Sequence, residues 1–336
     1  MSRAAVMGSG SWGTAFSMVL ADAGSDVVMW TRNADIAAQV NAEHRNERYQ
    51  PGIPLPPAVL ATTDAKRALA GADLLVLALP AQVAREHLRA WAPDIPESAV
   101  VVSLVKGIEL GTTRRMSEVI DEETGVGRDR IAVVSGPNLA REIAEHQPTA
   151  STIASRRAES AQVLAQACTT DYFRPYWTTD VVGTEIGGAV KNVIALANGM
   201  AVGMGLGENS QASIITRGLA EMTRLGVALG ADPMTFLGLA GVGDLVATCQ
   251  SPLSRNRTFG VNLGQGMSVA ETIEITKQTC EGYKSCQPIL ALAQAHGVDM
   301  PITEQVVEVL HRGRSPKTLI SFFMTRDTKR ESALPH

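Results

Sequence analysis

The fold of this chain is decided by a short stretch near its N-terminus, Ala4-Ala-Val-Met-Gly8-Ser-Gly10-Ser-Trp-Gly13. The apolar run Ala4–Met7 predicts a strand, the residues Thr14–Ala23 predict a helix, and Asp26–Trp30 predicts a second strand. In this strand, turn, helix, strand context the G-x-G-x-x-G spacing indicates a dinucleotide-binding turn, because its glycines allow a pyrophosphate to approach the backbone at a helix N-terminus. A glycine-rich turn without a ligand is the alternative.

The residues that follow the second strand, Thr31-Arg32-Asn33, bear on the choice of nicotinamide nucleotide. An NAD site usually carries Asp or Glu here to bind the ribose 2′-hydroxyl. This chain has no carboxylate at that point, and Arg32 stands where a cation would meet a 2′-phosphate. The sequence therefore favours NADPH over NADH, with a solvated Arg32 near Asp35 as the alternative.

Strand-like and helical patterns alternate through the first half of the chain. Helices are predicted over Ala81–Trp91 and Glu159–Cys168, and further strands over Leu74–Leu79, Ala99–Leu104, Ile131–Ser135, Ala150–Ala154 and Tyr172–Trp177. Such alternation predicts a mostly parallel sheet covered on both faces, a doubly wound α/β domain. Ligands bind beyond the carboxyl ends of such strands, which is where Lys106, Gly136 and Asn138 stand. The proline-rich run 41–57, with Tyr49, is predicted to be a loop or flap over that site.

A long apolar stretch, residues 184–207, follows the last predicted strand and contains one charged side chain after Glu185, that of Lys191. A helix that is apolar on every face is normally buried, and a buried ammonium either has a lowered pKa or lies beside a carboxylate. Lys191 is therefore a candidate for proton transfer, with snorkelling of its ammonium into water as the alternative. A membrane span is disfavoured because Lys191 and Asn192 lie at its middle.

After Gly183 the pattern is helical, which predicts a dinucleotide-binding domain over residues 1–183, a helical domain over 184–326 and a tail over 327–336. Helices are predicted from Asn209 to Gly230 and over Ser268–Lys277, Ser285–His296, Pro301–Gly313 and Ser315–Thr325. Arg217 and Glu221 on the first of these are predicted to be a helix-surface pair without a catalytic role.

Two polar groups interrupt the helical half. Asp244 follows a glycine-rich turn among apolar residues, where a carboxylate usually has a partner. Ser254, Arg255 and Asn256 collect hydroxyl, guanidinium and amide donors that suit a phosphate or a carboxylate. A basic surface loop, with Asp244 as a turn residue, is the alternative.

Composition sets the remaining limits. The chain has 336 residues, of which 45% are hydrophobic and 19% charged, and this length suffices for two globular domains. A net charge of −4 disfavours nucleic-acid and anionic-membrane surfaces as partners. The N-terminus shows no signal-peptide pattern, and the four cysteines have no metal-ligand spacing, so we expect a cytoplasmic protein with reduced thiols and no metal.

Together these segments resemble the bacterial NAD(P)-dependent sn-glycerol-3-phosphate dehydrogenases, from about Arg3 to about Thr325. The resemblance rests on the glycine motif and on five further segments, which are Lys106-Gly-Ile-Glu109, Gly136-Pro137 with Ala140 and Glu142, Gly187-Gly-Ala-Val-Lys-Asn192, Ile215-Thr-Arg-Gly-Leu-Ala-Glu221, and Ala240-Gly-Val-Gly-Asp-Leu245 with Ser254-Arg-Asn-Arg257. It implies a Rossmann-like domain followed by an all-helical domain like that of 6-phosphogluconate dehydrogenase. It also implies a homodimer formed through the helical domain.

The resemblance implies site residues position by position. The cofactor contacts would be Gly8, Gly10, Ser11, Trp12, Gly13, Arg32, Tyr49, Lys106, Ala140, Arg255, Thr279 and Glu281. The substrate contacts would be Lys106, Gly136, Asn138, Lys191, Asp244, Ser254, Arg255 and Asn256. Lys191 matches the proton acceptor and Asp244 its carboxylate neighbour. The family usually has Ser or Thr at position 138 and a small aliphatic residue at position 279, so Asn138 and Thr279 depart from its pattern.

The implied reaction is reduction of dihydroxyacetone phosphate to sn-glycerol 3-phosphate for phospholipid synthesis, with NADPH preferred and NADH possible. A β-hydroxyacid or 6-phosphogluconate-type dehydrogenase also pairs such a fold with a lysine, but the segment from Ser254 to Arg257 disfavours it. A nicotinamide-binding regulator without catalysis is a further alternative, against which Lys191, Asp244 and Arg255 argue together. A substrate panel with both nicotinamides would separate these hypotheses.

Overall fold

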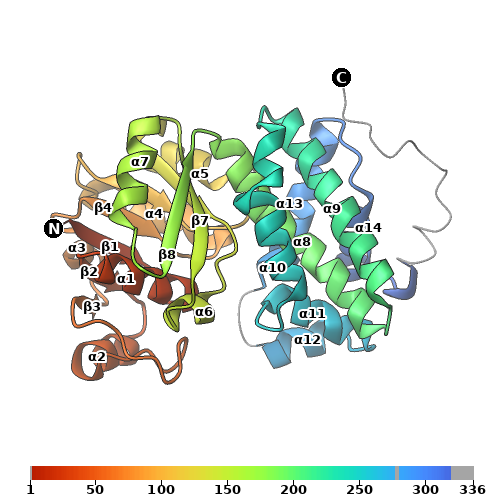
Figure 1. Cartoon of the computed structure of the whole chain (residues 1–336), viewed down its shortest axis with the longest axis horizontal. Coiled ribbons are helices and arrows are strands. Elements are labelled where there is room, and N and C mark those ends of the chain that lie inside the picture. Colours follow the sequence, from red (N-terminus) through yellow and green to blue (C-terminus); the bar gives the residue numbers. More distant parts are fainter. Residues whose placement is uncertain (1, 277–279, 319–336) are drawn as a thin grey trace.

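The computed structural model describes residues 2–276 and 280–318 and shows an eight-stranded sheet beside a body of helices (Figure 1). The strands are β1 Arg3–Met7, β2 Asp26–Trp30, β3 Val59–Thr62, β4 Leu74–Leu77, β5 Val100–Ser103, β6 Ile131–Ser135, β7 Thr149–Ser155 and β8 Phe173–Thr178. Their order is β3-β2-β1-β4-β5-β6-β7-β8, and only the pair β6 and β7 is antiparallel. The prediction of a mostly parallel sheet is confirmed. The sequence analysis missed β3, a four-residue edge strand that follows a proline-rich run.

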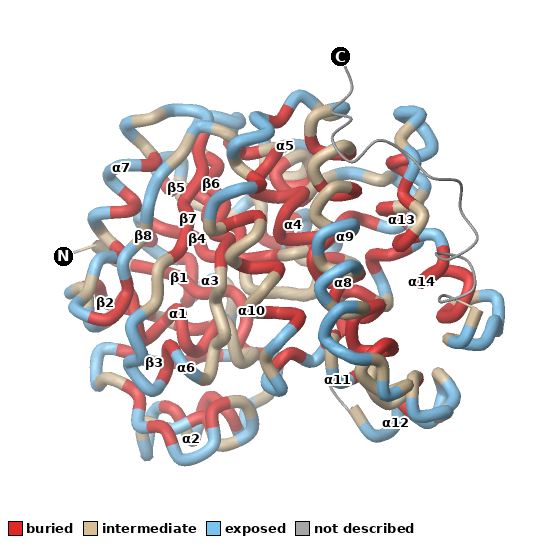
Figure 2. Tube along the Cα trace, turned by 45° about the vertical axis from the view of Figure 1, so that its right-hand side comes forward, coloured by how far each residue is buried: buried red, intermediate tan, exposed pale blue. Residues whose placement is uncertain are grey.

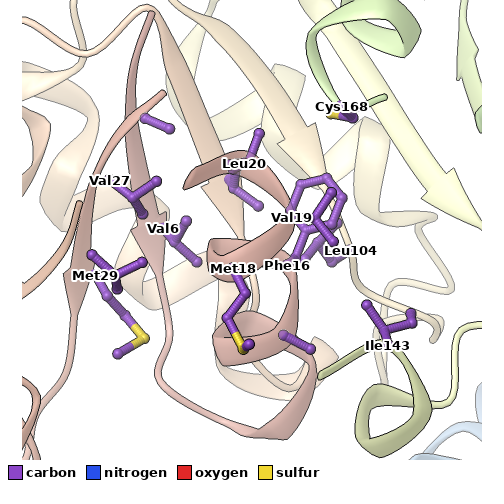
Figure 3. Packing of buried hydrophobic residues seen from close by; sticks show 14 of the residues in the cluster. Val6, Phe16, Met18, Val19, Leu20, Val27, Met29, Leu104, Ile143 and Cys168 are labelled. Carbon is purple, nitrogen blue, oxygen red and sulfur yellow. The ribbon is translucent and has the colours of Figure 1, made fainter. Parts of the chain in front are cut away.

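Helices cover both faces of this sheet. They are α1 Ser11–Asp22, α2 Ala34–Glu43, α3 Ala65–Leu69, α4 Ala81–Trp91, α5 Met116–Thr124, α6 Ala140–Ala144 and α7 Ala158–Ala167, with 3-10 turns at Ala92–Asp94 and Arg128–Arg130. Successive residues of a strand point to opposite faces, so that Val6 packs with Phe16 of α1 (Figure 3) while Met7 packs in the core beneath α4. Burial on both faces explains why these strands are continuously apolar.

The helix α8, Val181–Gly203, begins three residues after β8 ends and forms the centre of the helical body (Figures 1 and 2). By length and composition it could cross a bilayer, but 89% of its most apolar window is buried inside the protein. Near its start, the Glu185 carboxylate accepts hydrogen bonds from Arg115 Nη1 at 2.6 Å and from the Ser117 amide at 2.7 Å, both at the beginning of α5. These contacts fix α8 to the sheet domain. The division of the chain at residue 183 stays a prediction.

The other helices of this body surround α8. They are α9 Glu208–Ala228, α10 Asp244–Gln250, α11 Arg255–Gly264, α12 Val269–Thr276, α13 Glu281–Ala295 and α14 Pro301–Arg312, with a 3-10 turn η3 at Pro233–Leu237 and a π-helical turn η4 at Leu239–Gly243. Two glycines of α8, Gly199 and Gly203, face Gly260 and Gly264 of α11 so closely that a Cβ on any of them would collide with a backbone carbonyl of the other helix. The tail, the end of the helix predicted over Ser315–Thr325, and Thr279 lie outside the described residues.

The helices α1, α9 and α13 begin before their predicted starts, α1 at Ser11 rather than Thr14. The helix α9 begins at Glu208, one residue before the predicted start at Asn209, and its N-cap is Gly207. The helix α13 begins at Glu281, four residues before the predicted start. The sequence analysis also missed α2, which Asn33 caps by accepting hydrogen bonds from the amides of residues 35 and 36.

The prediction of a surface pair on α9 was wrong for Glu221. Its side chain is buried at 1% exposure, and its carboxylate accepts hydrogen bonds from the amides of Ile302 at 2.5 Å and Thr303 at 3.2 Å. Glu221 thus caps the first turn of α14 from a neighbouring helix, which satisfies amides that have no intrahelical partner. The spacing of residues along α9 gives no sign of this contact, because its partner lies 81 residues away.

Candidate active site

The glycine turn joins β1 to α1 and presents one open position. Gly8 has φ +136°, and a Cβ there would collide with the carbonyl of Ala78; a Cβ on Gly13 would collide with the carbonyl of Gly8. These two glycines allow the turn and the close packing of α1. A Cβ on Gly10 would have nothing within 4 Å, and Ser11 begins α1 directly after it. The helix N-terminus therefore lies next to an open backbone position, the arrangement that accommodates a pyrophosphate.

The aromatic and basic residues predicted to contact the cofactor lie around this turn. Trp12, Tyr49 and Ala140 pack against the same hydrophobic core as α1. The indole Nε1 of Trp12 is buried without a hydrogen-bond partner among the described residues. Arg32 follows β2 and is exposed, and it has no ion-pair partner in the described part of the chain. Such donors are available to a ligand.

Lys191 lies at a buried polar centre and does not snorkel. Its side chain is 9% exposed, and its Nζ lies 3.0 Å from Asp244 Oδ1 and donates to Thr248 Oγ1 at 2.7 Å. The second carboxylate oxygen, Asp244 Oδ2, accepts from Lys106 Nζ at 2.6 Å. Lys106 Nζ also donates to the carbonyl of Gly136 at 2.9 Å. One carboxylate thus joins two ammonium groups.

Glycines explain how three separate segments meet here. A Cβ on Gly187 would collide with the carbonyl of Ala240, and a Cβ on Gly188 would lie 2.7 Å from Ser135 Oγ. Because α8 lacks side chains at these two positions, the η4 turn and the end of β6 approach it one turn before Lys191. Gly241 has φ −103° and ψ −105°, which breaks the helix just before Asp244 and lets α10 start in a new direction.

Burial and charge act against each other at this centre. Burial alone would raise the pKa of Asp244, but the charges of Lys106 and Lys191 outweigh it and lower that pKa below its ordinary value. Burial lowers the pKa of Lys106 to about 8, despite the opposing charge of Asp244. The centre therefore combines an ionised carboxylate with an ammonium that can lose its proton near physiological pH.

The predicted phosphate-binding group begins a helix. Ser254 caps α11, accepting from the amide of Arg257 at 3.2 Å, and Arg255 and Asn256 are its first two helical residues. The side chain of Asn256 donates to Asn192 Oδ1 at 2.8 Å and accepts from the Gly282 amide at 2.9 Å. Asn192 in turn donates to the carbonyl of Lys106 at 3.1 Å. The Asn256 carboxamide therefore connects α11 with α8 and α13.

Two other predicted residues, Asn138 and Glu281, are partly exposed but carry buried side-chain polar atoms without a hydrogen-bond partner among the described residues. Both side-chain polar atoms of Asn138 lack a hydrogen-bond partner among the described residues, and so does Glu281 Oε2. Burial raises the pKa of Glu281 to about 7, although the charge of Arg255 opposes this. Native proteins rarely leave buried polar atoms unpaired, so these atoms mark places where a ligand would complete the hydrogen bonding.

Sequence reasoning assigned no role to Thr248 and Asn192. Thr248 Oγ1 accepts from Lys191 and lies 3.1 Å from Asp244 Oδ1, one helical turn after Asp244 on α10. Its position four residues from Asp244 was the available signal. Asn192, next to Lys191, could be identified only from its contacts across the domains. No group of three or more His, Cys, Asp or Glu that could hold a metal occurs in residues 2–276 and 280–318.

A dinucleotide-type turn on a doubly wound sheet, together with a buried lysine and aspartate on a helical domain, is typical of a nicotinamide-dependent dehydrogenase. Comparison with known proteins gives the family. Residues 3–161 match the family model for the N-terminus of NAD-dependent glycerol-3-phosphate dehydrogenase, and residues 180–321 match the model for its C-terminus. The chain therefore belongs to the NAD(P)-dependent glycerol-3-phosphate dehydrogenase family, whose members are oxidoreductases acting on a CH–OH group.

Individual relatives agree with this assignment. The chain is 60% identical over 329 residues to glycerol-3-phosphate dehydrogenase of Streptomyces griseus, covering 98% of each chain. It is 55% identical over 333 residues to a glycerol-3-phosphate dehydrogenase of Mycobacterium tuberculosis, again covering 98% of each. The crystal structure of glycerol-3-phosphate dehydrogenase from Coxiella burnetii superposes with a TM-score of 0.91 at 37% identity, covering 97% of this chain and 99% of that one.

Proposed function

We propose that this dehydrogenase reduces dihydroxyacetone phosphate to sn-glycerol 3-phosphate and that Lys191 transfers the proton. The observation that carries the proposal is the buried arrangement of Lys191, Asp244 and Lys106. A ketone that accepts a hydride becomes an alkoxide, which needs a proton from a positioned acid. Asp244 and Thr248 both hold the Lys191 ammonium, so its proton is directed from a fixed position.

The residues around the glycine turn fit a nicotinamide nucleotide. The open position at Gly10, the N-terminus of α1 and the unpaired Trp12 Nε1 would hold it, with Ala140, Arg255 and Glu281 as further contacts. When bound, its reduced nicotinamide supplies the hydride. Arg32 is exposed at the end of β2, where it would meet a 2′-phosphate, which supports a preference for NADPH with NADH as a slower alternative. Thr279 stays a predicted contact outside the described residues.

The substrate would lie between the glycine turn and the helical domain. Lys106, Gly136 and Asn138 approach it from the sheet, and Lys191 and Asp244 from α8 and α10. Its phosphate would meet Ser254, Arg255 and Asn256 at the beginning of α11, where helix amides and a guanidinium both attract an anion. Because the Asn256 carboxamide already bonds Asn192 and Gly282, its backbone amide is the better-placed donor.

The wider biological setting belongs to the same proposal. We propose a cytoplasmic homodimer that supplies glycerol 3-phosphate for phospholipid synthesis, with no nucleic-acid partner and no stable membrane insertion. A net charge of −4 and the burial of α8 support the last two points.

The test replaces Lys191 and follows NADPH oxidation with dihydroxyacetone phosphate. Positioned acid catalysis contributes roughly 10²–10⁴ in rate, so Lys191→Ala should lose at least about 100-fold in kcat while its Kd for NADPH stays unchanged. Lys66→Ala is the matched control, because Lys66 lies on α3 with a side chain that is 79% exposed. Near-normal turnover of Lys191→Ala would remove it from the mechanism. In the same assay, a wild-type kcat/KM that is higher with NADH than with NADPH would contradict the proposed role of Arg32.

A further inference from the structure

The loop between α2 and β3, residues 44–58, contains most of the run 41–57 predicted to be a loop or flap over the site, and is called the flap loop; residues 41–43 instead end α2. Its backbone is held by its own hydrogen bonds, from the Leu55 amide to the His44 carbonyl at 2.8 Å and from the Gln50 amide to the Asn46 carbonyl at 2.8 Å. Ile53 and Leu55 are buried in the core that α1 covers. The flap loop is therefore an ordered part of the domain, held by its own hydrogen bonds and by two buried side chains.

Two buried amide side chains extend from this loop to the glycine turn. Asn46 is fully buried, and its Nδ2 donates to the Ser9 carbonyl at 3.0 Å and to Thr14 Oγ1 at 2.8 Å. Gln50 is 1% exposed, and its Nε2 donates to the Ser11 carbonyl at 3.2 Å and to the Ala140 carbonyl at 3.1 Å. One amide nitrogen thus contacts Ser11 and Ala140, which lie 129 positions apart in the sequence (140 − 11).

Both carbonyls belong to the first residue of a helix. Ser11 begins α1, and Ala140 begins α6. The amides of a helix point towards its N-terminus and its carbonyls point away from it, so Gln50 leaves free the first amides of α1, to which the proposed function assigns the pyrophosphate. A second contact from the flap loop to α6 runs from Arg141 Nη1 to the Pro51 carbonyl at 2.6 Å.

We infer that Gln50 is a positioning residue for the dinucleotide, holding the N-termini of α1 and α6 at a fixed separation. The inference rests on the proposed function, in which α1 binds the pyrophosphate and Ala140 is a further cofactor contact, which we infer to be on the nicotinamide side. A dinucleotide must meet both ends of the site at once, and a displacement of about 1 Å at one end is enough to impair hydride transfer. Gln50 therefore acts on the whole dinucleotide, and less on a fragment that meets only α1.

The test compares a whole and a truncated ligand in Gln50→Met, which keeps the length of the side chain and removes the donor. The two lost hydrogen bonds should raise Kd for NADPH about tenfold and lower kcat about tenfold. Kd for 2′-phospho-ADP-ribose, which lacks the nicotinamide, should stay within about twofold. Gln211→Met is the matched control, since Gln211 Nε2 also donates to a backbone carbonyl, that of Leu206, but on the helical domain.

The variant Arg141→Met tests the same contact between the flap loop and α6 at a partly exposed position, where a substitution is less disruptive to folding. Arg141 has a side chain that is 37% exposed, and its loss should shift Kd for NADPH in the same direction by about threefold. Unchanged binding and turnover in both variants would overturn the inference, and so would an equal rise in Kd for both ligands. If Gln50→Met does not fold, the Arg141→Met result decides. A wild-type protein that binds NADPH but does not reduce dihydroxyacetone phosphate would refute the proposed function, while the Kd comparison would still test Gln50.

Discussion

Two carboxylates of the helical domain, Asp244 and Glu221, are equally buried at 1% exposure, yet their surroundings differ. Asp244 lies between two ammonium groups, whose charges lower its pKa below the ordinary value despite burial. Glu221 accepts hydrogen bonds from two backbone amides and from the Thr303 hydroxyl, and burial raises its pKa to about 7. Burial alone therefore does not set the charge of a carboxylate. The cationic partners favour the ionised form of Asp244, whereas burial favours the neutral form of Glu221 and raises its pKa to about 7.

The largest effect is expected when Asp244 loses its charge. In Asp244→Asn the two ammonium groups lose their shared counter-ion, so the Lys191 side chain is no longer held in place. We expect kcat for reduction of dihydroxyacetone phosphate to fall by roughly 10²–10⁴. Steady-state kinetics with NADPH measure this, and Glu221→Gln serves as the buried-carboxylate control with near-normal kcat. Equal losses of kcat in the two variants would abolish the distinction between the two carboxylates.

The second prediction concerns stability and Glu221. Its folded pKa of about 7 lies above the ordinary 4.5, so the neutral form favours the folded state. This contribution is complete below pH 4.5 and is lost as the pH rises to about 7, with a total of roughly 3 kcal/mol. Between pH 5 and pH 8 the wild type should therefore lose more free energy of unfolding than Glu221→Gln. Urea unfolding at the two pH values measures the difference, and parallel losses would contradict it.

The smallest effect is expected at Thr248, which distinguishes orientation from charge within the same centre. Thr248→Val keeps the shape of the side chain and removes the oxygen that accepts from Lys191. Loss of one hydrogen bond to a charged group should lower kcat about tenfold. The KM for dihydroxyacetone phosphate should change little, because the lost hydrogen bond orients the Lys191 ammonium for proton transfer and does not bind the substrate. Thr223→Val, which removes a hydrogen bond to the Leu219 carbonyl on α9, is the control, and an unchanged kcat in Thr248→Val would contradict the prediction.

The comparison also shows what the sequence could predict. The glycine turn, the buried Lys191 and the helical half follow from local patterns, since spacing and hydrophobicity within one segment decide them. The partner of a buried carboxylate cannot be predicted from local patterns, because it lies far away in the sequence. Lys106 and Asp244 lie 138 positions apart, and Glu221 contacts α14 across 81 positions. Sequence reasoning placed Asp244 near Lys191 only through the family resemblance, and it placed Glu221 on the surface because helical spacing gave it a plausible neighbour. Gln50 was missed because its two carbonyl partners, at Ser11 and Ala140, lie far from it in the sequence.

The continuity of α8 has a consequence for how this chain can change. The helix is fastened to the sheet domain at Glu185 and carries Lys191 six residues later, without an interruption between them. Each residue advances a helix by about 100° of rotation and 1.5 Å of rise. A single inserted or deleted codon between these positions would turn the amine away from its carboxylate while leaving every side chain intact. This part of α8 should therefore tolerate substitutions far better than insertions or deletions.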